Sequence, residues 1–375
     1  MLSSPSRTSS VPGDVALPSD GEDTIQSLSW SPVANHLASA SWDSKVRIYD
    51  VASAGSAQGV SALSAEGPVF SCDWAKDGKT IIAGGADKKI RIMDLSTGQQ
   101  DIVGSHSAPV RGVRFVDVPG TQGSIIVSGS WDKTVKFWDT RQQGAAVVTL
   151  HCDERVYSLD AKAHLAVIAT ADLDIHLIDL NNPTTFLSKT KSPLKHQTKA
   201  VTAFPNGEGW GTTSIEGRCG MNAVNEDDIG NVNFTFRCHR EFNASTKTHN
   251  IWAVNDVQFH PVYTTTFVTA GSDGAFSFWD RVAHSRLKGY PPITSPDAAG
   301  TPPSAITTTA FNHDGSLFAY ALGYDWSRGC AGNTQQTETK IMLHSVSEDD
   351  ARPKSVSRLM DDAVRGDERF SCRLT

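Results

Sequence analysis

Three residues of the chain have the types found in a hydrolase triad. His106, Ser128 and Asp132 could act as base, nucleophile and orienting carboxylate in nucleophilic catalysis. No nucleophile elbow, phosphate-binding loop or HExxH motif accompanies them. Because Ser and Asp recur at matching positions in other segments, we interpret the three residues, together with Trp138, as a hydrogen-bonded structural network. The chain is therefore predicted not to be an enzyme.

The cysteines give no sign of a metal site or of a disulfide framework. The sequence contains 6 Cys, none of them in a CxxC pair. A zinc site needs clustered Cys and His ligands, so an adjacent pair such as Cys238 and His239 is not enough. The scattered spacing is also unlike that of a disulfide scaffold. We expect no metal, no cofactor, and reduced thiols in the cytosol or nucleus.

A pattern that recurs along the chain positions the four residues of the network. Three segments align at once: SASWDSKVRIYD from Ser39, AGGADKKIRIMD from Ala83 and SGSWDKTVKFWD from Ser128. Weaker copies follow, so that seven acidic residues mark the middle turns: Asp43, Asp87, Asp132, Asp172, Glu216, Asp273 and Asp325. The two longest intervals come after the fifth and sixth copies, which predicts insertions at these places.

Hydrophobic and polar residues alternate within the copies, for example around Val46 and Ile48. Such alternation between small residues and a polar turn predicts short β-strands. Units of about 40–45 residues that are built from such strands and end in Trp-Asp or a near variant are typical of WD40 propeller blades. Residues 14–346 therefore resemble an all-β, single seven-bladed WD40 β-propeller, and we expect an N-terminal strand at 15–17 to close its last blade.

Composition and charge restrict the class of protein. The chain has 375 residues, of which 39% are hydrophobic and 20% charged, as is typical of a globular protein. A net charge of -7 argues against a dedicated DNA-binding protein. We expect no membrane span and no secretory signal, since no apolar run approaches about 20 residues. Residues 1–13 are predicted to be a disordered Ser/Pro-rich tail and residues 347–375 a charged flexible tail.

The sequence from Asn233 onward is similar to one group of WD40 proteins. The segments NFTFRCHREFN, FSFWD at 276–280 and YDWSRG at 324–329 resemble the nuclear-pore-associated mRNA export factors of the Gle/Rae type. The related spindle-checkpoint kinetochore propeller shares Cys238-His239-Arg240, whereas FSFWD and YDWSRG favour the export factors. The fifth copy departs from the family pattern, because Gly220 leaves the pairing of its outer strand in doubt.

The resemblance implies a non-catalytic adaptor for nuclear mRNA export. Its partner would be a nucleoporin, whose GLEBS motif would lie across one face of the propeller. The resulting complex would bind mRNA or mRNA-bound proteins, with a weak contribution from the propeller itself. We accordingly expect the protein in the nucleus and in the nuclear envelope at the nuclear pore complex, with shuttling to the cytoplasm.

Two tryptophans and three cations form the predicted partner site. Trp42 and Trp131 occupy equivalent turn positions of the first and third copies, where side chains are directed to the rim. Aromatic anchors of this kind are enriched at interfaces. The resemblance implies that Arg240 and Arg286, with the neighbouring Lys288, present positive charge to acidic residues of the partner. We expect these residues to complete one face.

A second group of cations is the candidate RNA-contact surface. It consists of Lys189, Lys191, Lys195, Lys199 and Arg237. Such side chains could make sequence-independent contacts to phosphates, which salt would weaken. A solvated charged loop is the alternative interpretation of the lysines.

Two other functions stay open at the level of sequence. A spindle-checkpoint adaptor would bind checkpoint kinases at a kinetochore scaffold. Trp138-Asp139-Thr140-Arg141 also matches the WDxR box of substrate receptors of cullin ubiquitin ligases, although that box is short and common. A propeller hydrolase is disfavoured, because no metal ligands occur that could line a channel.

Overall fold

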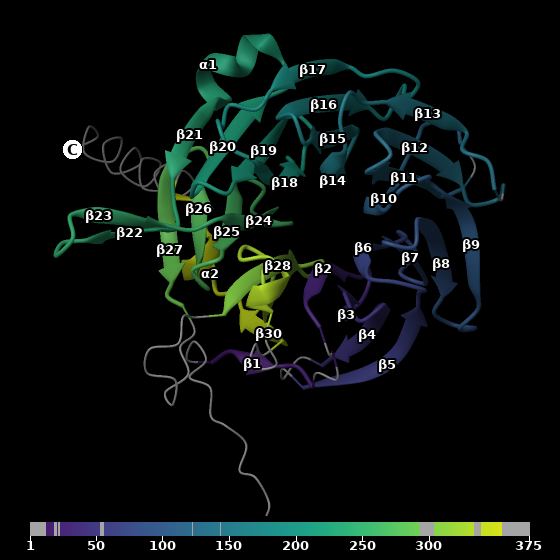
Figure 1. Cartoon of the computed structure of the whole chain (residues 1–375), viewed down its shortest axis with the longest axis horizontal. Helices are drawn as coiled ribbons and strands as arrows, with labels where there is room; N and C mark the ends of the chain where they lie inside the picture. The colour runs from purple at the N-terminus through teal and green to yellow at the C-terminus, as the bar shows by residue number, and fades with distance from the viewer. Residues whose placement is uncertain are drawn as a thin grey trace, which may run out of the picture.

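The protein is a ring of β-sheets. The computed structural model describes residues 13–354, except 19–20, 22, 53–55, 122, 143, 293–303 and 334–338. Seven four-stranded antiparallel sheets surround a common axis like the blades of a propeller (Figure 1). This architecture confirms the predicted seven-bladed fold. The helices among the described residues are too short and too polar to cross a membrane.

The strands of the first four blades follow one another in chain order. Blade 1 contains β2 (Ile25–Trp30), β3 (His36–Ser41), β4 (Lys45–Val51) and β5 (Ala57–Ser64). Blade 2 contains β6 (Val69–Trp74), β7 (Thr80–Gly85), β8 (Lys89–Asp94) and β9 (Gln100–Ser105). Blade 3 contains β10 (Val110–Val116), β11 (Ile125–Ser130), β12 (Thr134–Asp139) and β13 (Val148–His151). Blade 4 contains β14 (Val156–Lys162), β15 (Leu165–Thr170), β16 (Asp174–Asp179) and β17 (Ser188–Lys191).

The remaining blades complete the ring. Blade 5 contains β18 (Thr198–Ala203), β19 (Gly209–Ser214), β20 (Arg218–Ala223) and β21 (Phe234–Arg237). Blade 6 contains β24 (Val254–Phe259), β25 (Thr266–Gly271), β26 (Phe276–Asp280) and β27 (Ser285–Tyr290). Blade 7 contains β28 (Ala305–Phe311), β29 (Leu317–Gly323), β30 (Lys340–Ser345) and, from the start of the chain, β1 (Val15–Ala16).

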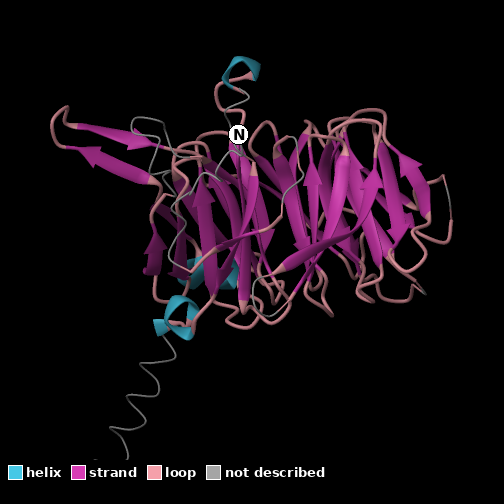
Figure 2. Ribbon diagram, turned by 90° about the horizontal axis from the view of Figure 1, so that it is seen from below, coloured by secondary structure: helices cyan, strands magenta, loops and turns pink. Residues whose placement is uncertain are grey.

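Insertions follow the fifth and sixth copies of the repeat. After β20 the chain forms η1 (Glu226–Asp228) and α1 (Ile229–Val232), and after β21 it forms the hairpin of β22 (Arg240–Asn243) and β23 (Thr248–Ile251). Figure 2 shows this hairpin projecting from the side of the disc. Most of the insertion after the sixth copy, at 293–303, lies outside the described residues. The doubt about Gly220 is removed, because β20 pairs with both β19 and β21.

The middle turns of all seven blades share one backbone geometry. The residue that follows each turn acid has a φ between 60° and 75°: Ser44, Lys88, Lys133, Leu173, Gly217, Gly274 and Trp326. In five of the turns the carboxylate also accepts a hydrogen bond from the backbone N–H two residues later, as Asp132 does from Thr134 at 3.0 Å. The seven sequence copies are therefore equivalent in three dimensions.

The central strands are buried on both sides, because each blade packs between two neighbours. All six residues of β15 are buried. Carboxylates within this core join successive inner strands. Asp160 accepts a hydrogen bond from the backbone N–H of Ala203 at 3.0 Å, and Asp256 accepts one from that of Thr309 at 2.7 Å. Burial raises the pKa of Asp256, so these bonds offset a desolvation cost.

The start of the chain closes the ring, as expected. In β1, Val15 pairs with Leu343 and Ala16 with Met342, and the backbone N–H of Leu17 donates to the carbonyl of Ile341 at 2.9 Å. Because β1 covers the outer edge of β30, that edge is not left open for pairing with another chain. This arrangement confirms the predicted N-terminal strand in the last blade.

The chain end that follows the repeats begins as part of the packed body. Glu348–Ala351 form the short helix α2, and the side chain of Asp350 is buried. Asp350 forms an ion pair with Lys288 at 2.5 Å and accepts a hydrogen bond from the Tyr290 hydroxyl at 2.6 Å. The expectation of a loose tail from residue 347 is therefore wrong for residues 347–354. The rest of that segment and residues 1–12 lie outside the described residues.

Candidate functional site

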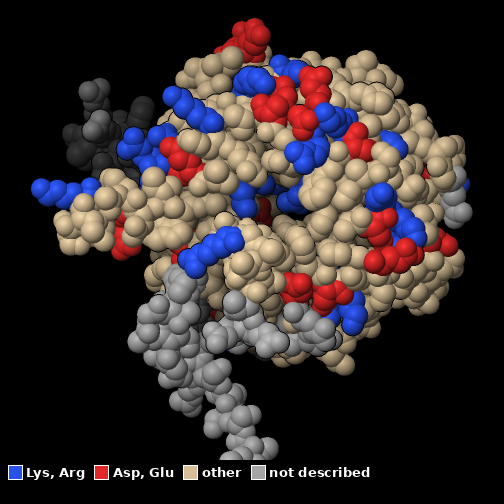
Figure 3. Space-filling view, viewed as in Figure 1, with Lys and Arg blue, Asp and Glu red and all other residues tan. Residues whose placement is uncertain are grey.

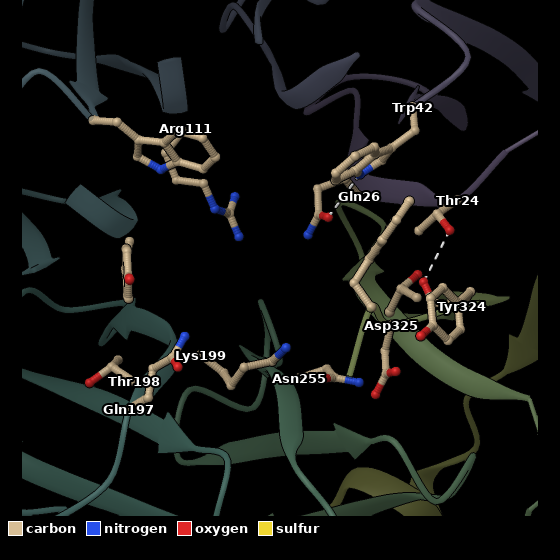
Figure 4. A pocket seen from close by; sticks show the side chains of 14 residues that line it. Thr24, Gln26, Trp42, Arg111, Gln197, Thr198, Lys199, Asn255, Tyr324 and Asp325 are labelled. Carbon is tan, nitrogen blue, oxygen red and sulfur yellow. Dashed lines mark hydrogen bonds between the residues drawn. The ribbon is translucent and has the colours of Figure 1, made fainter. Parts of the chain in front are cut away.

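A cavity opens where the inner strands meet the middle turns of the blades. Its volume is about 360 Å³ (Figure 4). Five aromatic side chains surround it: Trp42, Trp131, Tyr157, Tyr324 and Trp326. Two cations, Arg111 and Lys199, also line it. Figure 3 shows Lys and Arg side chains around the central hollow of this face.

The two predicted tryptophans lie at this cavity. Trp42 and Trp131 belong to the turns that follow β3 and β11, so the equivalent turn geometry directs both to one face. Phe70 lies between them, with ring centroids 5.4 Å from Trp42 and 5.8 Å from Trp131. The indole N–H of Trp42 donates to Gln26 at 3.2 Å, and Trp131 is 37% exposed. The structure thus joins them into one aromatic surface.

The cations of the cavity have little solvent around them. Burial and the charge of Arg114 together lower the pKa of Arg111 to about 10, against a smaller raising contribution from Asp256. Burial also lowers the pKa of Lys199, with a raising contribution from Asp325 and a lowering one from Arg111. Arg111 stays charged at neutral pH with such a pKa. Neither Arg111 nor Lys199 has a hydrogen-bond or ion-pair partner within the part of the chain that the structure describes.

Arg240 lies at the same face but is already engaged. Its guanidinium donates to the backbone carbonyl of Glu216 at 2.5 Å and to that of Gly217 at 3.2 Å, and its side chain is 16% exposed. Arg240 therefore joins the hairpin of β22 and β23 to the turn of blade 5. It does not line the central cavity.

Arg286 and Lys288 lie elsewhere, which corrects the expectation of one shared face. Arg286 pairs with Trp279 near the end of the third strand of blade 6. That end is opposite the middle turn, because the third strand runs away from the turn. Lys288 is occupied by its ion pair with Asp350. The resemblance implied that these two residues belong to the partner site, but strand direction places Arg286 at the other end of the blade and Lys288 is paired with Asp350.

The five candidate RNA contacts do not form one patch. Lys189 and Lys191 both form ion pairs with Asp174, Lys191 at 2.6 Å. Lys199 lines the central cavity, while Lys195 is exposed in the loop before β18. Arg237 is exposed at a separate cavity of about 330 Å³ between blades 5 and 6. The lysine cluster is thus in part a row of surface ion pairs.

The triad-like residues of blade 3 are linked inside the blade. His106 Nδ1 lies 2.9 Å from Asp132 and Nε2 lies 2.8 Å from Ser128, whose hydroxyl also accepts the Trp138 indole N–H at 2.8 Å. Burial lowers the pKa of His106 despite the opposing charge of Asp132. Ser128 is fully buried, so its hydroxyl cannot reach a substrate.

Blade 6 repeats this network with a threonine in place of the serine. His239 lies 2.9 Å from Asp273 and 3.0 Å from Thr269, and the indole N–H of Trp279 donates to the Thr269 hydroxyl at 3.0 Å. The recurrence of one network in two blades indicates a structural role. It also shows that His239, which the sequence offered as part of a family marker, holds its blade together.

Several residues of the cavity were not predicted from the sequence. Arg111 follows the first residue of an inner strand, as Lys199 does in blade 5, and a cation at this position in two copies of the repeat is the signal that could have identified it. Asp325 was recognised only as a turn residue, and Trp326 only as part of a motif. The charged residues of the WDxR segment bind each other, since Arg141 forms an ion pair with Asp139 at 2.5 Å.

Comparison with known proteins agrees with this architecture. The WD domain, G-beta repeat model matches residues 17–50, 59–94 and 99–139. The WD40 repeat protein poxJ of Penicillium oxalicum is 48% identical over 91% of this chain and 96% of its own length. The mRNA export factor GLE2 of Chaetomium thermophilum is 46% identical over 91% of this chain and 92% of its own. The Poly(A)+ RNA export protein of Schizosaccharomyces pombe is 43% identical over 92% of this chain and 94% of its own. The chain belongs to the family of WD40-repeat mRNA export factors of the Gle2/Rae1 type.

Proposed function

We propose that the protein is a non-catalytic adaptor of nuclear mRNA export that binds the GLEBS motif of a nucleoporin. The role in export rests on relatives named mRNA export factor and Poly(A)+ RNA export protein, which match nearly the whole chain. The observation that supports the binding site is the central cavity, where aromatic rings surround two poorly solvated cations that have no partner among the described residues. The protein would act in the nucleus and at the nuclear pore complex, and would shuttle to the cytoplasm.

The chemistry of the cavity favours an acidic peptide with apolar anchors. A carboxylate that enters would neutralise Arg111 and Lys199, and hydrogen bonds between charged groups are strong where little water competes. Apolar side chains next to the carboxylate would pack on Trp42 and Trp131, the residue type most often found at interface hot spots. The net charge of -7 makes this local positive potential specific to the cavity rather than a property of the whole surface.

Calorimetry with a synthetic peptide of a nucleoporin GLEBS motif tests this proposal. Truncation of a buried aromatic anchor commonly costs 2 kcal/mol or more, so Trp131→Ala should weaken binding about tenfold to thirtyfold. Arg111→Gln should weaken it by at least as much, because a buried carboxylate would lose its counter-charge. Arg237→Gln is the matched control, since Arg237 is an exposed cation at a different cavity. Full affinity in the first two variants, with circular dichroism unchanged, would exclude this face.

A pull-down from nuclear extract separates this function from the alternatives. An export adaptor should retain nucleoporins and mRNA-bound proteins. Checkpoint kinases would instead indicate the kinetochore adaptor, and a cullin adaptor would indicate the ubiquitin-ligase receptor. The RNA contribution of the isolated propeller is expected to be weak, because its candidate contacts are dispersed.

A further inference from the structure

The middle turn of blade 7, Tyr324-Asp325-Trp326, differs from the other six turns in what it presents to the central cavity. Its backbone follows the repeat, since Trp326 has a φ of 61° and Asp325 accepts a hydrogen bond from the Ser327 N–H at 3.1 Å. In the other blades the positive-φ position holds smaller or unbranched residues: Ser44, Lys88, Lys133, Leu173, Gly217 and Gly274. A tryptophan is an unfavourable residue in that conformation. The turn therefore holds a large ring where the fold does not require one.

The ring of Trp326 covers one of the aromatic anchors. It stacks on Trp42 with ring centroids 4.4 Å apart and an interplanar angle of 23°. The indole N–H of Trp326 is buried and has no hydrogen-bond partner among the described residues. A buried N–H without a partner is costly. The stacking contact on Trp42 is thus made although the backbone of Trp326 has an unfavourable positive φ and its indole N–H lacks a hydrogen bond among the described residues.

The carboxylate of the same turn lines the cavity that holds the two cations. Asp325 lines the cavity with Lys199 and Arg111, and Figure 4 shows its side chain in the same cavity as these two cations. The hydroxyl of Ser272 in blade 6 donates to the carboxylate of Asp325, and the Thr24 hydroxyl donates to the Tyr324 carbonyl at 3.0 Å. These contacts fasten the turn between blades 6 and 1. Burial raises the pKa of Asp325, but hydrogen bonds from Ser272 and Ser327 and the charge of Lys199 outweigh burial and keep the pKa low.

We propose that Tyr324-Asp325-Trp326 is a built-in competitor for the peptide site. The turn offers the cavity an aromatic ring on Trp42 and a carboxylate that shares the cavity with Lys199, which are the two features that an acidic peptide with an apolar anchor would bring. Binding of the peptide therefore requires Trp326 to leave Trp42. This inference rests on the proposed function, because it assumes that such a peptide binds at the cavity. On this inference, the turn of blade 7 lowers the affinity of the cavity for the peptide.

The test is that two tryptophan substitutions on one face should change the peptide affinity in opposite directions. The probe is the same synthetic GLEBS peptide, measured by calorimetry. Trp326→Ala should tighten binding about threefold to tenfold, because the peptide no longer displaces a stacked pair. Asp325→Asn should tighten it in the same direction, since a competing charge is removed. Trp131 lines the same cavity and is stacked on no turn residue among those described, so Trp131→Ala should weaken binding.

The state of the turn can also be followed without affinity data. Two stacked indoles give an exciton signal in far-ultraviolet circular dichroism, which should be present in the free protein and absent in Trp326→Ala. Addition of the peptide to the unsubstituted protein should remove the same signal. Trp326→Gly serves as a second variant if Trp326→Ala does not fold, because glycine tolerates a positive φ.

Each outcome separates the two proposals. If the unsubstituted protein binds the peptide and Trp326→Ala and Trp326→Gly bind it equally or more weakly, the competitor proposal is wrong and the proposed function stands. If the exciton signal persists in the complex, the proposal is also wrong. If neither the unsubstituted protein nor any variant binds the peptide, the proposed function fails and the competitor proposal fails with it.

Discussion

At the scale of single residues, buried polar side chains hold the blades together through shared partners. The Ser128 hydroxyl binds both His106 Nε2 and the indole N–H of Trp138, so its removal leaves two buried nitrogen atoms without a partner. We expect Ser128→Ala to lower the free energy of unfolding by about 2–3 kcal/mol. The exposed Ser107→Ala, which only touches Asp132 at 3.3 Å, should cost less than about 1 kcal/mol. Denaturation in urea measures both values, and a neutral Ser128→Ala would contradict a structural role.

Buried histidines should make the fold sensitive to mild acid. Burial lowers the pKa of His106, His176 and His260 below the ordinary value of 6.5. The unfolded chain therefore takes up these protons near pH 6.5, whereas the folded protein does so only at lower pH. The free energy of unfolding should consequently fall as the pH decreases from about 7.5 to about 5.5.

Melting temperatures across this pH range test the histidine prediction. The effect of His260 can be isolated, because its Nδ1 accepts the backbone N–H groups of Val262 and Tyr263 and cannot do so once protonated. His260→Gln should reduce the loss of stability between pH 7.5 and pH 5.5. The exposed His151→Gln should leave it unchanged. A melting temperature that rises toward pH 5.5 would show that other groups dominate.

At the scale of elements, one short strand decides whether the ring is closed. Removal of residues 1–17 takes away β1, uncovers the edge of β30 and deletes Asp14, which contacts His344 at 2.7 Å and accepts the Tyr320 hydroxyl at 2.7 Å. The deletion should lower the melting temperature by about 3–6 °C, since it removes both backbone pairing and buried polar contacts. Deletion of residues 1–12 is the matched control, because it ends before Asp14. Equal melting temperatures for the two deletions would refute the closing role of β1.

At the scale of the whole molecule, charge distribution limits how RNA can be bound. The protein carries a net charge of -7, and Lys189 and Lys191 are already paired with carboxylates. Three of the five candidate contacts are left for phosphates and they are dispersed, so binding of single-stranded RNA by the isolated protein should be weak and should not depend on sequence. The slope of log K against log salt should be shallow, about −1 to −2.

A titration with fluorescent single-stranded RNA at several salt concentrations measures this slope. Lys195→Gln and Arg237→Gln together should reduce it further, whereas Lys189→Gln should have a smaller effect because Lys189 is paired. Tight binding that salt does not weaken would show that the contacts are not to phosphates.

The sequence alone determined the features that depend on local order along the chain. The positions of the seven turns, the alternation of the strands, the closing strand at 15–17 and the equivalence of Trp42 and Trp131 all follow from a repeat whose copies fold alike. The His106 network could be proposed for the same reason, because recurrence distinguishes a structural residue from a catalytic one.

Only the tertiary structure decided which side chains from different blades meet. Arg111 and Lys199 are 88 positions apart and become neighbours in one cavity because both lie on inner strands of the ring. The resemblance implied that Arg286 belongs to the site, yet the direction of its strand places it at the other end of blade 6. Trp326 reaches Trp42 because blade 7 adjoins blade 1 when the ring closes. Contacts of this kind depend on distances through space between blades, and the local pattern of a repeat does not encode them.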